Sequence, residues 1–229
     1  MAEIYAIIVA AGSGSRFGSA LPKQFCRLMG RPVVMTAIER IRQTVPGVDV
    51  RLVLSEAFMD RWQAMCREAG FASPQVVAGG DSRWASVRNA LETIPHSGGD
   101  AVVMVHDAAR PLITRHVADR LLEALAGGHD GAVPCVAVVD SIRHLRPDGT
   151  SVAVARSDYR CVQTPQAFML EDLRRAYAMG YSPEMTDDAS VMEAAGMKDI
   201  ALVDGDDALM KITRPGDLEC VERYLAAGI

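Results

Sequence analysis

Glycine, arginine and lysine residues follow an apolar run close to the N-terminus. The run Ile4 to Val9 leads into Ala10-Ala-Gly-Ser-Gly-Ser-Arg-Phe-Gly-Ser-Ala-Leu-Pro-Lys-Gln-Phe25. Glycines let a backbone turn tightly and bring its N–H groups close to a bound anion. Arg16 and Lys23 add two positive charges at the same place. This combination suits a nucleoside triphosphate, and a reaction in which negative charge builds up on a phosphate and on a departing pyrophosphate.

The loop matches neither of the two common glycine-rich phosphate loops. A Walker loop ends in Gly-Lys-Ser/Thr, whereas Gly14 is followed by Ser15 and Arg16. The dinucleotide fingerprint needs a third glycine where Phe17 stands, and Gly18 comes one place too late. A Gly-Ser-Gly-Ser turn is also typical of ordinary strand-to-helix connections. The added arginine and the Leu-Pro-Lys-Gln sequence favour the phosphate-binding interpretation.

A second group of polar residues follows another apolar run, in His106-Asp-Ala-Ala-Arg-Pro111. A carboxylate at Asp107 could hold Mg²⁺ together with phosphate oxygens, because magnesium prefers oxygen ligands. Arg110 could bind a phosphate or pair with Asp107. From these residues alone, the structural ion pair is the more common arrangement.

Four further segments carry polar residues at turns. In Gly79-Gly-Asp-Ser-Arg-Trp-Ala-Ser86, the side chains of Asp81 or Ser86 could contact a base or ribose, and the segment also fits a plain capped helix start. The segments Thr164–Phe168 and Thr186–Ser190 fit ordinary turn and capping chemistry equally well. Lys211 stands in a short connection before the last expected helix, where a lone lysine is usually solvated.

Strand and helix patterns alternate along the chain. The expected strands are Ile4–Ala10, Val50–Leu54, Val76–Val77, Ala101–Val105 and Gly131–Val139. The expected helices start near Pro32, span Ala57–Ala69 and Arg83–Leu91, run from a Thr114 cap to Ala126, and span Ala189–Ala195. Such alternation predicts an α/β fold with a doubly wound, mostly parallel sheet. Ligands bind beyond the carboxyl ends of such strands, where the first glycine-rich loop and Asp107 would lie.

Residues 140–162 break this alternation, within what we expect to be a single domain over residues 1–229. Two extended arms surround Pro147-Asp-Gly149, and Asp-Gly is a strong hairpin signal. An isolated two-stranded hairpin is marginally stable in water, so it needs a partner surface. A protruding dimerisation arm and a hairpin folded back on its own domain are equally compatible with the residues.

Composition and charge exclude several classes of function. The chain has 229 residues and a formal net charge of -5, which argues against nucleic acid as a partner. No apolar run reaches the ~18 residues that cross a bilayer, so we expect no membrane association. Five scattered cysteines indicate reduced thiols in a cytoplasmic protein, and the five histidines lack metal-ligand spacing. No Gly-x-Ser-x-Gly elbow supports acyl transfer.

The series of motifs resembles the 2-C-methyl-D-erythritol 4-phosphate cytidylyltransferases, within the wider sugar-phosphate nucleotidylyltransferases. The resemblance covers nearly the whole chain. It is carried, in this order and spacing, by Ala10–Phe25, Gly79–Val87, Val105–Leu112, Thr164–Phe168, Thr186–Glu193 and Lys211–Leu218. It implies a Rossmann-like nucleotidyltransferase fold, a homodimer formed through the 140–162 arm, and a Mg²⁺-dependent reaction.

The implied reaction joins CTP and 2-C-methyl-D-erythritol 4-phosphate in non-mevalonate isoprenoid biosynthesis. The substrate phosphate attacks the α-phosphorus of CTP, pyrophosphate leaves, and 4-diphosphocytidyl-2-C-methyl-D-erythritol forms. The nearest alternative within the same fold is a relative that acts on another polyol phosphate, such as ribitol 5-phosphate. A non-catalytic nucleotide-binding protein with a decayed site is the alternative from a different class. Loss of Arg16, Lys23 or Asp107 would indicate it, and all three are present.

The resemblance also implies a role for individual residues. The catalytic positions would be Arg16, Lys23, Lys211 and Arg156, with Arg156 reaching across the dimer. The CTP-binding positions would be Ala10, Ala11, Gly12, Gly14, Gly80, Asp81 and Ser86. The substrate-binding positions would be Asp107, Arg110, Ser141, Thr164 and Thr186, and Asp107 would also hold the metal with the CTP phosphates.

Three positions depart from the usual residues of the family. Ser141 stands where threonine is common and keeps the hydroxyl, and Phe17 stands where methionine is common. Leu209 stands two residues before the late lysine, where asparagine is frequent. Some relatives carry a fused cyclodiphosphate synthase after this domain, and we expect none beyond Ile229.

Overall fold

A central eight-stranded sheet runs through the computed structural model, which describes residues 3–12, 21–96 and 99–228. The strands follow the order β10-β7-β11-β6-β1-β4-β5, and β12 pairs with β7. Their bounds are β1 Ile4–Val9, β4 Asp49–Leu54, β5 Gln75–Ala78, β6 Val102–Asp107, β7 Gly131–Ala137, β10 Arg160–Val162, β11 Gln166–Met169 and β12 Ile200–Asp204. The predicted Gly14 and Arg16 lie outside the described residues.

The sheet is mixed and mostly parallel. The pairs β1–β4, β1–β6, β4–β5 and β7–β12 are parallel. Strand β11 is antiparallel to both β6 and β7, and β10 is antiparallel to β7. The sequence patterns did not indicate β11 or β12, because these strands are short or partly exposed and lack a long apolar run.

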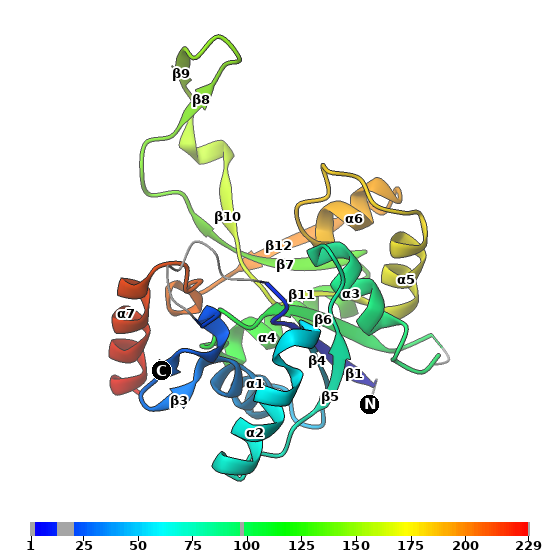
Figure 1. Ribbon diagram of the computed structural model, residues 1–229. Helices are drawn as coiled ribbons and strands as arrows, with labels where there is room; N and C mark the ends of the chain where they lie inside the picture. The colour runs from blue at the N-terminus through cyan, green and yellow to red at the C-terminus, as the bar shows by residue number, and fades with distance from the viewer. Residues whose placement is uncertain (1–2, 13–20, 97–98, 229) are drawn as a thin grey trace.

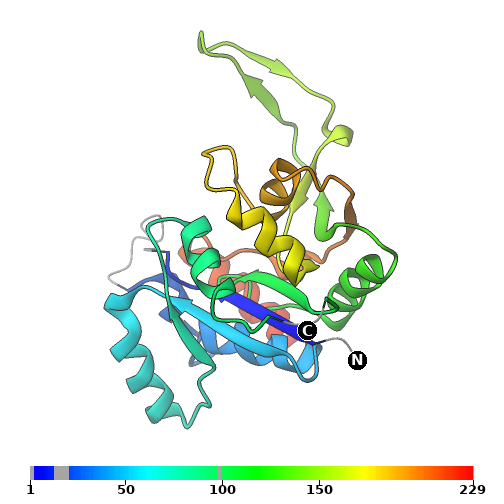
Figure 2. The same ribbon diagram turned by 90° about the vertical axis from the view of Figure 1, so that its right-hand side faces the viewer.

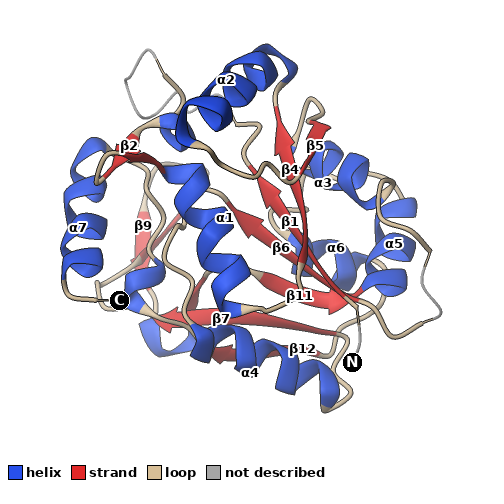
Figure 3. Ribbon diagram, turned by 90° about the horizontal axis from the view of Figure 1, so that it is seen from below, coloured by secondary structure: helices blue, strands red, loops and turns tan. Residues whose placement is uncertain are grey.

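Helices cover both faces of the sheet (Figure 3). Their bounds are α1 Val33–Thr44, α2 Met59–Ala69, α3 Arg83–Leu91, α4 Arg115–Ala126, α5 Leu170–Ala178, α6 Asp188–Ala194 and α7 Pro215–Ala226. Successive strand side chains point to opposite faces. Ile8 and Met104 therefore join the core under α1, α2 and α4, while Ile7 and Val105 join the core under α3, α5 and α6. These two cores confirm the doubly wound α/β prediction.

The predicted helix Arg83–Leu91 and the predicted helix from Thr114 to Ala126 are confirmed at both ends, and the bounds of the other expected elements shift by a few residues. Thr114 occupies the N-cap position of α4, but its side chain makes no capping hydrogen bond. Its hydroxyl donates instead to the carboxylate of Asp206, at 3.4 Å. The predicted cap position of Thr114 is therefore confirmed, but the capping hydrogen bond of its side chain is absent. No helix of the described ranges is long and apolar enough to span a bilayer.

The segment between β7 and β10 leaves the body of the molecule. Within it, β8 (Arg143–Leu145) and β9 (Ser151–Ala153) form an antiparallel pair. Figures 1 and 2 show this pair extending away from the sheet, joined to it by a short helical turn and β10. The turn is stabilised by the Asp148 carboxylate, which accepts hydrogen bonds from the backbone N–H and the hydroxyl of Thr150. The role of this segment in dimerisation stays a prediction.

Candidate active site

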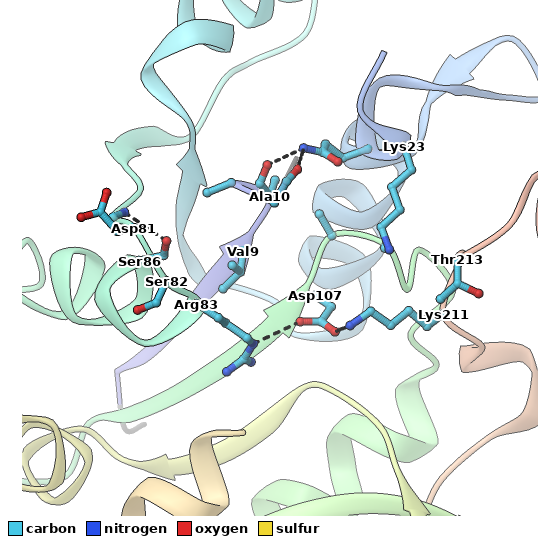
Figure 4. Close-up of a pocket in the computed structure, with 16 residues that line it drawn as sticks. Val9, Ala10, Lys23, Asp81, Ser82, Arg83, Ser86, Asp107, Lys211 and Thr213 are labelled. Atoms are coloured by element: carbon cyan, nitrogen blue, oxygen red, sulfur yellow. Dashed lines mark hydrogen bonds and ion pairs between the residues drawn. The ribbon is translucent and has the colours of Figure 1, made fainter. Parts of the chain in front are cut away.

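A pocket of about 510 Å³ opens at the carboxyl ends of β1 and β6 (Figure 4). The loop after β5 and the segment before α7 complete its wall. The pocket lies where a doubly wound sheet binds ligands. It brings together nine predicted site residues: Ala10, Ala11, Gly12, Lys23, Gly80, Asp81, Ser86, Asp107 and Lys211.

The segment after β1 is fixed by a buried glutamine. Gln24 is only 4% exposed, and its side-chain amide donates to the carbonyl oxygens of Ala10 at 2.6 Å and Gly12 at 3.1 Å. Gln24 belongs to the short helical turn Lys23–Phe25, so the same turn carries Lys23. The Lys23 side chain points into the pocket (Figure 4). The packing of Gln24 thereby sets the position of a positive charge beside the first loop.

The loop after β5 contains the cap of helix α3 and a glycine, Gly80, that packs closely against Ala85. Ser82 caps α3 by accepting from the backbone N–H of Ala85, which confirms the capped helix start. The Ser86 hydroxyl accepts from the backbone N–H of Gly80 at 3.1 Å. A Cβ added to Gly80 would stand 2.5 Å from the Cβ of Ala85, so a larger residue does not fit there. This tight turn shapes the pocket wall next to Asp81.

Asp107 is the central carboxylate of the pocket, at the end of β6. Its Oδ1 lies 3.5 Å from Nε of Arg83, and its Oδ2 accepts a 2.6 Å hydrogen bond from Nζ of Lys211 (Figure 4). Burial raises the pKa of Asp107, but the charges of Arg83 and then Lys211 outweigh burial and hold that pKa well below its usual range. The carboxylate is therefore ionised at neutral pH.

Arg110 does not form the direct ion pair with Asp107 that its spacing favoured. Its guanidinium donates instead to the carbonyl oxygens of Leu209 at 2.9 Å and Val162 at 3.3 Å. The Nε atom of Arg110 is buried without a hydrogen-bond partner among the described residues. Leu209 itself is fully buried in the core, so this departure from the family pattern serves packing and offers only its backbone oxygen.

Buried hydrogen bonds of Thr164 and His106 fix the end of β6. His106 is fully buried and donates through Nε2 to the carbonyl oxygen of Arg110, which leaves Nδ1 to accept from the Thr164 hydroxyl at 3.1 Å. The same hydroxyl accepts from the backbone N–H of Asp107 at 3.0 Å. Burial lowers the pKa of His106 to about 4. The imidazole is thus neutral and structural, and Thr164 orients Asp107.

Five of the predicted site residues that the structure describes do not line this pocket: Arg110 and Thr164, whose contacts are given above, and three residues on the surface. Ser141, Arg156 and Thr186 are exposed. Arg156 belongs to the short helical turn Arg156–Asp158 at the base of the protruding segment, where it donates to the carbonyl oxygen of Val139. Thr186 directly precedes the capping residue of α6. Within a single chain, the pocket therefore gathers most of the predicted nucleotide-binding positions, whereas Ser141, Arg156 and Thr186 lie apart from it.

The structure adds pocket residues that sequence reasoning missed. Gln24, Ser82, Arg83 and Thr213 line the cavity. The sequence offered one indication for Arg83, because it follows the helix cap Ser82 within the segment Gly79–Ser86. Thr213 had none, because its role depends on the backbone N–H and hydroxyl that it donates to Asp217.

Comparisons with known proteins identify relatives over nearly the full chain. The sequence model of the family described as IspD, 2-C-methyl-D-erythritol 4-phosphate cytidylyltransferase, matches residues 4–227. The chain is 40% identical over 222 residues to the 2-C-methyl-D-erythritol 4-phosphate cytidylyltransferase of Bacteroides fragilis, covering 96% of this chain and 98% of the relative. It is 42% identical over 214 residues to the enzyme of that name from Bacteroides thetaiotaomicron, covering 93% and 95%.

Solved structures share the fold along the whole chain. The 2-C-methyl-D-erythritol 4-phosphate cytidylyltransferase of Thermus thermophilus superposes with a TM-score of 0.74 at 30% identity, covering 99% of this chain and 100% of that one. The Francisella tularensis protein of the same name superposes with a TM-score of 0.77 at 28% identity, covering all of both chains.

Proposed function

Because the chain belongs to the 2-C-methyl-D-erythritol 4-phosphate cytidylyltransferase family, we propose that it joins CTP to 2-C-methyl-D-erythritol 4-phosphate in non-mevalonate isoprenoid biosynthesis. A phosphate oxygen of the substrate attacks the α-phosphorus of CTP. The bond between the α-phosphorus and the bridging oxygen breaks, and its electron pair leaves with pyrophosphate. The substrate phosphate is already an anion at neutral pH, so the step needs no general base.

The observation that carries this proposal is the group of cations around the pocket. Lys23 and Lys211 reach it from two distant parts of the sequence, and Arg83 reaches it from a third. Among the described lining residues these three cations outnumber the two carboxylates Asp81 and Asp107, in a chain whose net charge is -5. Charges fixed in advance stabilise the negative charge that develops during phosphoryl and nucleotidyl transfer.

The nucleotide would occupy the described pocket. Ala10, Ala11 and Gly12 offer backbone at the end of β1, and Gly80, Asp81 and Ser86 form the opposite wall. We assign the cytidine to the space between these two walls, and the triphosphate to the side of the pocket that carries Lys23 and Lys211. The neighbouring Gly14 and Arg16 keep their assigned roles as predictions from the sequence.

Asp107 is the residue that would hold Mg²⁺. The described residues contain no group of three or more His, Cys, Asp or Glu side chains placed for a metal. Magnesium at phosphate-transfer sites commonly uses one or two carboxylates together with substrate phosphates, which fits the ionised Asp107. When bound, the ion would neutralise charge on the triphosphate.

The polyol phosphate would bind between the pocket and the protruding segment of a second chain. Arg110 contributes a half-buried guanidinium, whose charge suits a phosphate and whose buried Nε lacks a hydrogen-bond partner among the described residues. Ser141, Thr186 and Arg156 would complete the site, with Arg156 supplied by the other subunit. We propose a cytoplasmic homodimer.

Exposed apolar side chains on and beside the protruding segment support this dimer. The exposed fractions are 77% for Val139, 73% for Leu145, 46% for Tyr159, 44% for Val162 and 59% for Leu202. Clustered exposed apolar residues often mark a surface that another chain covers. A two-stranded pair with little core of its own also gains stability from such a cover.

Pyrophosphate release from CTP and Mg²⁺ tests the proposal, with 2-C-methyl-D-erythritol 4-phosphate and ribitol 5-phosphate run in parallel. Release with the first substrate alone is the expected result. Release with ribitol 5-phosphate alone would keep the mechanism and overturn the substrate. CTP binding without release from either substrate would indicate a nucleotide-binding protein with a decayed site.

A further inference from the structure

A buried row of polar groups connects the pocket to helices α5 and α6. Asp188, the first residue of α6, has no exposed surface. Its Oδ2 accepts a 2.6 Å hydrogen bond from Nη2 of Arg83, and its Oδ1 accepts a 2.7 Å hydrogen bond from the hydroxyl of Tyr177. The Nε atom of the same arginine lies 3.5 Å from Asp107. One guanidinium thus bridges a carboxylate inside the pocket and a carboxylate behind it.

Asp188 is anchored without help from Arg83. The side-chain oxygen of Gln166 on β11 accepts from the backbone N–H groups of Asp188 and Ala189, at 3.1 and 3.0 Å. The amide of Gln166 donates to Asp187, which caps α6 together with Ser190. Strand β11 pairs with β6, the strand that ends at Asp107. The two carboxylates are therefore fixed to neighbouring strands of one sheet.

The two contacts of Arg83 are unequal. A guanidinium beside an aspartate usually forms two parallel hydrogen bonds. Here the short bond goes to the fully buried Asp188, whose charge needs partners because burial removes its water. The contact with Asp107 is single and longer. Oδ1 of Asp107, a residue that lines the pocket, therefore has only this long contact with Arg83, while Oδ2 accepts the short hydrogen bond from Lys211.

We propose that Asp188 is a positioning residue that acts through Arg83. Its hydrogen bond keeps the guanidinium next to Asp188, so that Arg83 does not form two hydrogen bonds with Asp107. The Asp107 carboxylate thereby stays accessible to the reacting phosphates. The proposal rests on the proposed function in one respect, namely that Asp107 faces the reacting groups.

A double-mutant cycle tests this dependence. The variant Asp188→Asn keeps the side-chain volume and removes the charge that holds Arg83. We expect kcat to fall about 10–100-fold, as is typical when a residue supporting a site residue is lost, with a smaller change in KM for CTP. Added to Arg83→Met, the same substitution should change kcat by less than about 2-fold, because its partner is already gone.

A crystal structure of ligand-free Asp188→Asn gives a readout that needs no activity. We expect Arg83 to form two short hydrogen bonds with Asp107 in place of the single contact at 3.5 Å. The variant Arg83→Lys adds a check if Asp188→Asn does not fold. A lysine keeps the charge but cannot bridge two carboxylates in this way, so kcat should fall as in Arg83→Met.

Matched controls separate positioning from stability. Arg88→Met removes an arginine of the same helix that pairs with Glu92, at 3.6 Å, and should keep kcat. The proposal is overturned if the effects of Asp188→Asn and Arg83→Met multiply, or if Asp188→Asn lowers only the melting temperature. An unmoved Arg83 in the Asp188→Asn structure would also overturn it. A wild type that uses only ribitol 5-phosphate would refute the proposed substrate, and the cycle would then be run with that compound.

Discussion

The pocket and the protruding segment differ in what holds their functional residues. In the pocket, Asp107, Lys23 and the Gly80 turn are fixed by buried partners from the same chain, namely Thr164, Gln24 and Ser86. In the protruding segment, the strand β8 is exposed along its whole length, and Arg156 is exposed at its base.

This difference shows which part of the site is complete within one chain. The pocket is preorganised because its polar groups are held by hydrogen bonds in a packed environment. The protruding segment offers exposed apolar and basic side chains, which a second molecule would have to order. Substitutions in the two regions should therefore affect different steps of binding and catalysis.

The largest effect is expected in the pocket, from Lys23→Ala. Loss of one preorganised charge should lower kcat about 10²–10³-fold while CTP affinity changes much less. Steady-state kinetics and CTP titration by calorimetry measure the two quantities. Lys198→Ala serves as the control, because Lys198 is an exposed lysine outside the pocket. An unchanged kcat in Lys23→Ala would remove Lys23 from the catalytic group.

A smaller and different effect is expected in the protruding segment, from Arg156→Met. Loss of a charged hydrogen bond should lower kcat/KM for the polyol phosphate about 10–100-fold and leave CTP affinity unchanged. Arg143→Met is the control, because the hydrogen bonds of Arg143 run across the β8–β9 pair, to Ser151. If Arg156→Met weakened CTP binding instead, the separation between the two regions would be wrong.

The buried hydrogen bonds of Thr164 should contribute to the free energy of unfolding. Thr164→Val leaves the buried backbone N–H of Asp107 and the Nδ1 atom of His106 without a partner. Each such loss costs about 1–3 kcal/mol, so the free energy of unfolding should fall by at least that amount in urea denaturation. Thr164→Ser keeps the hydroxyl and should restore most of the loss. Equal stability of the valine and serine variants would contradict the structural role.

The smallest effect on the free energy of unfolding is expected from Asp217, at the start of α7. The Asp217 carboxylate accepts from the backbone N–H groups of Thr213 and Arg214, and Asp217→Ala should cost about 1 kcal/mol at pH 7. Burial raises the pKa of Asp217, but these hydrogen bonds outweigh burial and lower it below the ordinary value of 3.8.

The sign of the pH dependence follows from that lowered pKa. The unfolded chain binds the proton more readily, so the stabilisation by Asp217 is present above pH 3.8 and is lost as the pH falls through the lower folded value. Denaturation curves of wild type and Asp217→Ala should therefore converge at acidic pH. A stability difference that stayed constant down to the acid limit would contradict this assignment.

Much of the fold and half of the site could be predicted from the sequence. Long apolar strands such as Val102–Asp107 leave a clear pattern, and the strand-end rule then places Asp107 and the first loop together. The antiparallel β11 leaves no such pattern, since its four residues gain their place from pairing with β6 and β7. Antiparallel pairing depends on distant residues that no local pattern reveals.

The bridging role of Arg83 was beyond sequence reasoning for the same reason. Arg83 and Asp188 lie 105 positions apart and meet only in the folded chain. Spacing instead favoured Arg110 as the partner of Asp107, because the two are close in the sequence. In the folded chain, the guanidinium of Arg110 donates instead to the carbonyl oxygens of Leu209 and Val162. Sequence proximity was therefore a poor guide to the charge partners of this carboxylate.

The pocket of one chain and the protruding segment of another are proposed to form a single active site. Mixing Lys23→Ala with Arg156→Met, after dissociation and reassociation, tests this pairing most directly. Each heterodimer would contain one site with both residues intact, so activity should recover to about a quarter of the wild-type value. Heterodimers that form, as seen by native mass spectrometry, but stay inactive would contradict it.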